Sequence, residues 1–304
     1  MSLYEKKHPD KCIQVNGKTY CCDTLGTPLI ENDKALCRFE KDNLTVSAIP
    51  SNPLWLSLLV IFAYIGVLVV NALASLLPLN GQTTGEVSDA YPNLFAPAGL
   101  TFSIWGVIYV LLGIYVGFQL LTAKSLDSAE YPYTNIVFII SCVFNMAWIF
   151  AWHYEQFLIS VLLMIGLFIS LTLIYLSFHT EYRGLYTQSK PLLVTIPFSV
   201  YYGWISVATV ANITTYLVST GWTGGSIGET TWTVIMLVVI TFIGIFMISL
   251  KGDIFYVAVL IWAVIGILIK RIEDVMNPQP TIVTVAIIGL VFLGFEVIFG
   301  SYRR

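Results

Sequence analysis

The amino-acid sequence predicts an all-α fold, a polytopic transmembrane helix bundle with about eight spans. Of the 304 residues, 57% are apolar and only 11% are charged, whereas an ordinary soluble domain has roughly 45–50% and about 25%. The apolar residues form long runs, and the stretches between the runs collect proline, glycine, asparagine and charge. Because so little charge is available to cover a surface in water, we expect a lipid bilayer to surround most of the chain.

Residues 1–53 differ from the rest and are expected to form a polar N-terminal tail. They hold seven of the 15 Lys and Arg residues, and they lack the features of a signal or transit peptide. The alternation over residues 12–21, centred on Asn16-Gly17, predicts a small hairpin. Four of the five cysteines lie here: Cys12, Cys21, Cys22 and Cys37. Their spacing lacks paired C-x2-C ligands, so we favour a flexible tail with reduced thiols over zinc or a disulfide, and predict no metal site.

Eight segments are long and apolar enough to cross a membrane. A hydrocarbon core of about 30 Å requires around 20 mostly apolar residues in one helix. The predicted spans are 54–77, 99–122, 134–152, 157–178, 191–218, 230–250, 254–270 and 281–300. The seventh is the shortest, so a count of seven is the alternative.

The distribution of basic residues orients the predicted bundle. With the N-terminus inside, the inner loops and the C-terminal tail carry Lys124, Arg183, Lys190, Lys251, Arg303 and Arg304. The outer loops 78–98, 153–156 and 219–229 carry no Lys or Arg, and Lys270 and Arg271 depart from the pattern. The positive-inside rule therefore predicts an integral, multi-pass protein with both termini cytoplasmic. This arrangement suits a bacterial or archaeal inner membrane, an organelle and a eukaryotic plasma membrane alike.

Several function classes find no support in the sequence. The net charge is -3 and there is no basic stripe of the kind that binds nucleic acid. The chain has no Walker A loop, G-x-S-x-G elbow or H-E-x-x-H motif, and no nucleophile–base pair, so we do not predict an enzyme. His153, His179 and Asp253 fall at span edges and are expected to be interfacial.

Aromatic and amide side chains recur at helical spacing on three predicted spans. Residues three, four or seven apart share one helix face. The three faces are Trp105 with Tyr109; Asn145 with Trp148 and Trp152; and Trp204 with Ala208 and Asn212. If they converge, they enclose a pocket with indole walls and amide donors, which suits a flat, largely apolar ligand. The alternative is that the tryptophans only pack helices and the asparagines hydrogen-bond across them.

These clusters, in this order, resemble the TspO/MBR family of tryptophan-rich sensory proteins and translocator protein (the peripheral benzodiazepine receptor). Pro97 stands eight residues before the Trp105-x3-Tyr109 pair, Asn145-x2-Trp148 follows, and Trp204-x3-Ala208-x3-Asn212 comes third. The resemblance covers about 55–218 and implies a five-helix membrane domain over 54–218. The residues 219–304 would add three transmembrane helices without a family counterpart, as in a divergent member.

The resemblance implies a function and a set of ligand-binding residues. The family binds tetrapyrroles and sterol-like or other apolar ligands in a cavity under the first loop. Carried over, this site comprises Pro97, Phe102, Trp105, Tyr109, Asn145, Trp148, Trp152, Trp204, Ala208 and Asn212. We therefore expect a membrane-embedded binding, sensory or translocator protein for a flat apolar small molecule. No cofactor is predicted, although a porphyrin or other tetrapyrrole is a candidate ligand.

Two other functions stay open. Glu296 is a carboxylate well inside the last span, and such residues often mark proton-coupled transport, so a secondary transporter is the first alternative. Glu296 is also close enough to Arg303 and Arg304 to extend toward the interface without any such role. A membrane enzyme or an assembly subunit is the second alternative. The sequence is compatible with a homo-oligomer.

Overall fold

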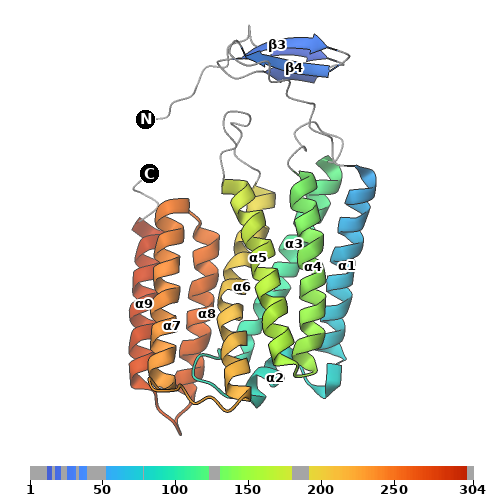
Figure 1. The fold of residues 1–304 in the computed structure, drawn as a ribbon. Coiled ribbons are helices and arrows are strands. Elements are labelled where there is room, and N and C mark those ends of the chain that lie inside the picture. The colour runs from blue at the N-terminus through green and yellow to red at the C-terminus, as the bar shows by residue number, and fades with distance from the viewer. Residues whose placement is uncertain are drawn as a thin grey trace.

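The computed structural model describes residues 12–15, 18–21, 26–31, 34–39, 53–77, 79–122, 131–179 and 192–299. From residue 53 onward these described residues are helical apart from short connections, and eight helices are long and apolar enough to span a membrane (Figure 1). The predicted all-α membrane bundle and its eight spans are thus confirmed. The seventh helix, α8 (Ile254–Glu273), continues three residues beyond its predicted end.

The N-terminal part contains four short strands in two antiparallel pairs. β1 (Cys12–Val15) pairs with β2 (Lys18–Cys21), which confirms the predicted hairpin around Asn16-Gly17. β3 (Gly26–Glu31) pairs with β4 (Lys34–Phe39), a second hairpin that we did not predict. Regular strands therefore occur where we expected a flexible tail. The state of the four cysteine thiols lies outside the described side chains.

Five of the long helices close into a ring. They are α1 (Leu54–Leu76), α3 (Ile104–Thr122), α4 (Tyr131–His153), α5 (Phe157–His179) and α6 (Leu192–Ser219). Contacts run from α1 to α3, on to α6, α5 and α4, and back to α1. Their buried faces carry large apolar side chains, whereas leucines, isoleucines and phenylalanines remain exposed on the outside, as expected for lipid-facing surfaces.

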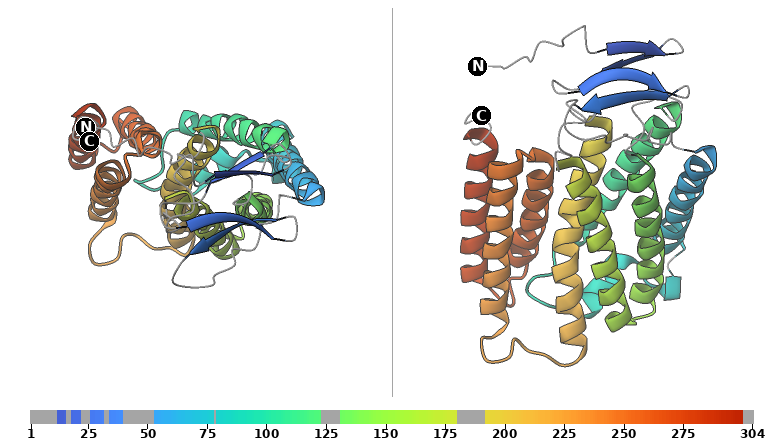
Figure 2. Two further views of the ribbon diagram at one scale, coloured as in Figure 1. Left: turned by 90° about the horizontal axis from the view of Figure 1, so that it is seen from above. Right: turned by 45° about the horizontal axis from the view of Figure 1, so that its top comes forward.

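The other three long helices form a second group beside the ring. α7 (Glu229–Phe246), which continues into the π-helical turn η5 (Met247–Lys251), α8 and α9 (Pro280–Phe299) pack against one another. Figure 2 shows them gathered at one side of the bundle. α8 joins the two groups, because it packs along α6. The approach is close at Gly203, where an added Cβ would lie 3.0 Å from the backbone oxygen of Tyr256.

A long connection between α1 and α3 covers one end of the ring. It contains the 3-10 turn η2 (Leu79–Gly81), the short helix α2 (Thr84–Ala90), an extended stretch over residues 91–98, and the 3-10 turn η3 (Gly99–Ser103). Thr83 and Glu86 cap α2 with reciprocal hydrogen bonds, a capping box. We call residues 79–103 the lid. The opposite end of the bundle holds both the start of α1 and the end of α9 (Figure 1).

Candidate functional site

The three predicted aromatic faces meet beneath the lid, and Trp105 is at their centre. Its ring stacks on Tyr109 with centroids 5.7 Å apart, and it lies 5.7 Å from Trp148 of α4. It also makes an edge contact with Trp204 of α6 at 6.2 Å. Phe102 of the lid touches Trp204 edge-on at 6.0 Å. Side chains from α3, α4, α6 and η3 therefore form one continuous aromatic cluster.

A small cavity, which we call the inner hollow, lies on the α4–α6 side of this cluster. Its volume is about 40 Å³, enough for about one water molecule. Eight of the ten predicted site residues line it: Pro97, Phe102, Trp105, Trp148, Trp152, Trp204, Ala208 and Asn212. The aromatic side chains themselves fill the expected pocket, so a flat ligand can enter only if they move.

The inner hollow also has lining residues that we did not predict. On α6 these are Val207, Ala211 and Thr215, and the lid contributes Thr84, Ser88 and Ala96. Ala211 and Thr215 continue the helical spacing of Trp204 and Ala208, so the sequence periodicity contained this signal. No such spacing identifies the lid residues, because their positions depend on how the lid folds over the end of the ring.

The predicted amide donors are used between helices. Asn145 accepts a hydrogen bond from Nδ2 of Asn71 on α1 at 2.9 Å and donates to the Tyr201 hydroxyl at 3.1 Å. It does not line the inner hollow. The Asn212 amide lies 2.9 Å from Ser160 Oγ of α5. Both amides therefore link spans, as buried amides in a membrane must find partners.

A larger cavity, the outer hollow, lies on the α1 side of the same aromatic cluster. Its volume is about 330 Å³, and Tyr109 lines it together with Phe102 and Trp105. The other lining residues are Asn71, Ser75, Thr83, Thr84, Gly85, Glu86, Asp89 and Gly99. Thr84, Phe102 and Trp105 border both hollows, so the side chains of Phe102 and Trp105 are the aromatic part of the partition between them.

Two indole N–H groups in the cluster have no partner. The Nε1 atoms of Trp148 and Trp204 are buried and make no hydrogen bond to any described residue. Both side chains line the inner hollow. By contrast, Trp152 Nε1 donates to the backbone oxygen of Thr84 at 3.1 Å. Unpaired donors in a dry interior are costly, so each such group calls for an explanation.

The end of α4 anchors the first half of the lid. His153 is fully buried, and its ring nitrogens lie 3.0 Å from the Gln82 backbone oxygen and 3.1 Å from Thr84 Oγ1. Asn80 in turn donates to the His153 backbone oxygen at 3.0 Å. His153 ends α4 and Asp253 caps α8, so both lie at span ends, and both side chains are buried. Asp253 is 7% exposed, because it caps α8 and accepts a hydrogen bond from Ser199 of α6.

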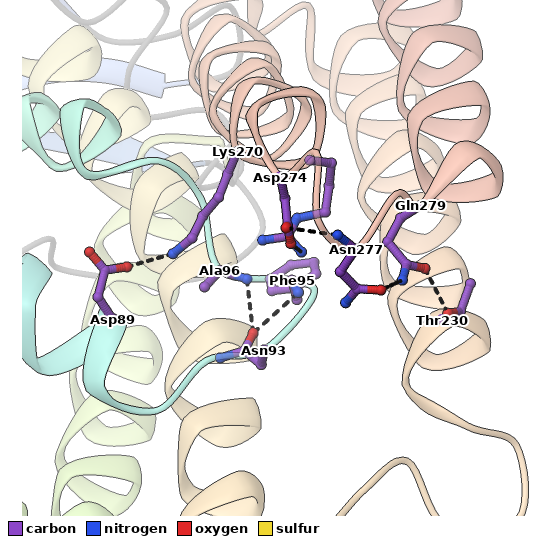
Figure 3. Close-up of polar contacts among 10 residues, drawn as sticks. Asp89, Asn93, Phe95, Ala96, Thr230, Lys270, Asp274, Asn277 and Gln279 are labelled. Atoms are coloured by element: carbon purple, nitrogen blue, oxygen red, sulfur yellow. Dashed lines mark hydrogen bonds and ion pairs between the residues drawn. The ribbon is translucent and has the colours of Figure 1, made fainter.

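Helix α8 anchors the second half of the lid. Ala98 N donates to the Gly266 backbone oxygen at 3.0 Å, and Trp262 Nε1 donates to the Thr101 backbone oxygen at 3.0 Å. Lys270 pairs with Asp89 of α2 at 2.5 Å. Figure 3 shows this pair beside the Asn93 turn, where Asn93 Oδ1 accepts from the backbone N–H groups of Phe95 and Ala96.

Hydrogen bonds hold the Glu86 carboxylate in its ionised form. Its Oε2 accepts from the Thr83 backbone N–H at 2.6 Å. The hydrogen bonds from the Thr83 backbone and side chain lower the pKa of Glu86 below the ordinary carboxyl value. Glu86 is exposed and, in the described part of the chain, makes no ion pair. It therefore presents an uncompensated negative charge at the rim of the outer hollow.

Glu296 lies apart from both hollows. It is on α9, which packs mainly against α7 and α8, and its side chain is half-buried. Among the described residues there is also no group of three or more His, Cys, Asp and Glu side chains that could hold a metal ion.

Comparison with known families gives a match over most of the chain. A family model described as TSPO-like protein matches residues 57–299. The match includes all eight membrane helices and extends far beyond residue 218, where we expected the resemblance to end. It therefore gives the last three helices the family counterpart that we did not expect. No curated protein and no solved structure matches the chain. The chain belongs to the TSPO-like protein family.

Proposed function

We propose that this integral membrane protein binds a flat, largely apolar small molecule between α3, α4 and α6, as a sensory or translocator protein does. The observation that carries the proposal is the pair of buried indole N–H groups of Trp148 and Trp204, which have no hydrogen-bond partner among the residues that the structure describes. A ligand with an acceptor atom would satisfy these donors, and its flat face would stack on the rings. Tetrapyrrole-like and sterol-like molecules are the ligand classes suggested by the family.

Ligand entry requires the partition between the hollows to open. The inner hollow of about 40 Å³ is too small for such a ligand, whereas the outer hollow of about 330 Å³ is in the usual range for small-molecule sites. Phe102 belongs to the lid and Trp105 begins the first turn of α3. A rotation of these two side chains would join the hollows into one site beneath the lid.

A titration with protoporphyrin IX dimethyl ester, a neutral flat porphyrin, tests this function. We expect the purified protein in a neutral detergent to shift the absorbance of the porphyrin, which gives a dissociation constant independent of tryptophan emission. Replacing both Trp148 and Trp204 with Leu should weaken binding about tenfold or more, since two donors and two stacking faces are lost. The control is Trp55→Leu, because Trp55 is 59% exposed at the start of α1. Equal affinity in all three proteins would refute the site.

We further propose that both ends of the chain face the cytoplasm. Eight spans return the chain to the side on which α1 begins, and Lys251, at the end of the sixth span, is on that same side. At the lid end, Lys270 and Arg271 are paired with Asp89 and Asp274. Their charge is thus compensated, which supports the positive-inside orientation. Asn43-Leu44-Thr45 is a glycosylation sequon, and a glycan at Asn43 in a eukaryotic host would reverse the orientation.

The transporter alternative gains no support from the geometry. Glu296 has no hydrogen bond or ion pair within the described part of the chain, and it lines neither the inner nor the outer hollow. A coupling carboxylate must sense the substrate through contacts or through its field. We therefore keep ligand binding as the conclusion.

A further inference from the structure

The outer hollow combines an aromatic wall with an acidic rim. Phe102, Trp105 and Tyr109 form one side, and the exposed carboxylates of Glu86 and Asp89 stand at its mouth. The hydroxyl oxygen of Tyr109 is buried next to the Asn145 side chain. Aromatic faces and carboxylates both attract organic cations, and the aromatic contribution is largest with tryptophan.

The charges around the mouth do not cancel. Asp89 is neutralised by Lys270, whereas Glu86 keeps its charge. The wider lid end comprises residues 77–98, 153–156, 219–229 and 270–280, which add the acidic residues Glu155, Glu229, Glu273 and Asp274. The Lys and Arg residues in these segments are Lys270 and Arg271. Six acidic residues against two basic ones give this face a net charge of -4. Such a field raises the local concentration of cations and repels anions.

We propose that the outer hollow binds the cationic head group of a flat aromatic amphiphile. The ammonium group would lie between Glu86 and the face of Trp105, and the flat apolar part would extend past Phe102 toward Trp148 and Trp204. This inference rests on the proposed function and narrows it. Among flat ligands the site favours cations over neutral molecules, and neutral molecules over carboxylates.

Three fluorescent probes with one flat body and different heads test the proposal. They are pyrenylmethylammonium, pyrenemethanol and pyrenecarboxylate, titrated into the full-length protein in a neutral detergent at low ionic strength. Energy transfer from tryptophan to pyrene reports binding. We expect the cation to bind about fivefold tighter than the alcohol, and the carboxylate to bind about fivefold weaker than the alcohol. A factor of this size corresponds to one partly exposed charge contact.

Glu86→Gln is the decisive variant, and Glu273→Gln is its matched control. A glutamine at position 86 preserves the capping box, so α2 keeps its cap while the charge is lost. Glu273 is exposed at the same end and does not line the outer hollow. Glu86→Gln should reduce the preference for the cation about fivefold and leave the alcohol unaffected. Glu273→Gln should leave the preference within about twofold of the parent protein.

The outcomes separate this inference from the proposed function. If the alcohol binds but head charge makes no difference, or if both variants change the preference equally, the cation site is refuted and the aromatic site stands. If no probe binds, the aromatic site itself is refuted. Unchanged affinity of Glu86→Gln for the alcohol shows that the variant is folded, so a lost cation preference then supports the proposal.

Discussion

The backbone N–H of Ala98 donates to the backbone oxygen of Gly266 across a 3.0 Å hydrogen bond. This bond joins the lid of the five-helix ring to α8 of the second helix group. The Gly266 oxygen belongs to a regular helix turn, and Gly266 allows the approach because it lacks a Cβ. An added Cβ would overlap the Thr101 side chain. Helix α8 thus supports the lid as well as packing along α6.

Replacing Gly266 with alanine should therefore loosen the lid. The new methyl group overlaps Thr101 and forces η3 away from α8, at a cost of about 1–3 kcal/mol. We expect a lower thermal unfolding temperature in detergent and faster hydrogen exchange at Ala98. Gly294→Ala is the control, because no atom lies within 4 Å of the Cβ added there. Equal effects of the two substitutions would contradict the role of Gly266.

The pair formed by Lys270 and Asp89 should contribute modestly and depend on salt. Lys270 is 24% exposed and Asp89 is 57% exposed at the side chain, and exposed pairs contribute about 0–1 kcal/mol. Lys270→Gln should accelerate hydrogen exchange in α2 at low ionic strength and much less at high ionic strength, because salt screens exposed charges. A salt-independent effect would indicate lost packing of the lysine side chain instead.

Asn145 should behave as a structural residue. Asn145→Ala leaves the Asn71 amide and the Tyr201 hydroxyl without the partner they have in the buried network. The expected loss of stability is about 1–3 kcal/mol, with coupling to Asn71→Ala in a double-mutant cycle of thermal unfolding. If Asn145→Ala instead weakened binding of the neutral porphyrin while stability stayed unchanged, Asn145 would be a ligand donor.

The cap of α2 should fail at acid pH. The pKa of Glu86 is lowered in the folded protein, so its contribution to stability is present above the unfolded pKa of about 4.3 and is lost as the pH falls through the lower folded pKa. We expect hydrogen exchange of the first turn of α2, corrected for the intrinsic pH dependence of exchange, to increase below about pH 4. Glu86→Gln should remove this transition, since a neutral amide does not titrate in that range.

Glu296→Gln provides a test of the transporter alternative. Because Glu296 contacts neither hollow, the affinity for the neutral porphyrin should stay within about twofold of the parent protein. When the porphyrin affinity of both proteins is measured at pH 5 and pH 8, Glu296→Gln should show the same pH dependence as the parent protein. A binding constant that loses its pH dependence in Glu296→Gln would revive proton coupling.

The helices and the faces on which their aromatic residues lie could be predicted from the sequence, for different reasons. Runs of about 20 apolar residues can hardly adopt another structure in lipid, since a helix satisfies its own backbone groups. The spacing of Trp105, Trp148 and Trp204 placed each on a definable face. The family resemblance added the expectation of a five-helix domain over 54–218, which periodicity does not contain.

The size of the cavity could not be predicted from the spacing of these residues. Helical spacing assigns Trp148 and Trp204 to defined helix faces. The rotamers of Phe102 and Trp105 decide whether the space between those faces is open or filled. Similarly, the spacing of Asn145 did not distinguish a ligand donor from a link between helices. Its partners Asn71 and Tyr201 lie 74 and 56 residues away in the chain.

The sequence by itself determined the membrane environment, the eight spans and the aromatic composition of the site, because hydropathy and helical period are local properties of the chain. Only the tertiary structure decided that Phe102 and Trp105 divide the site into two hollows, that Glu86 remains uncompensated at the mouth of one, and that Gly266 brings α8 against the lid. These are relationships between segments distant in sequence. They depend on side-chain volume and close packing, which no local pattern records.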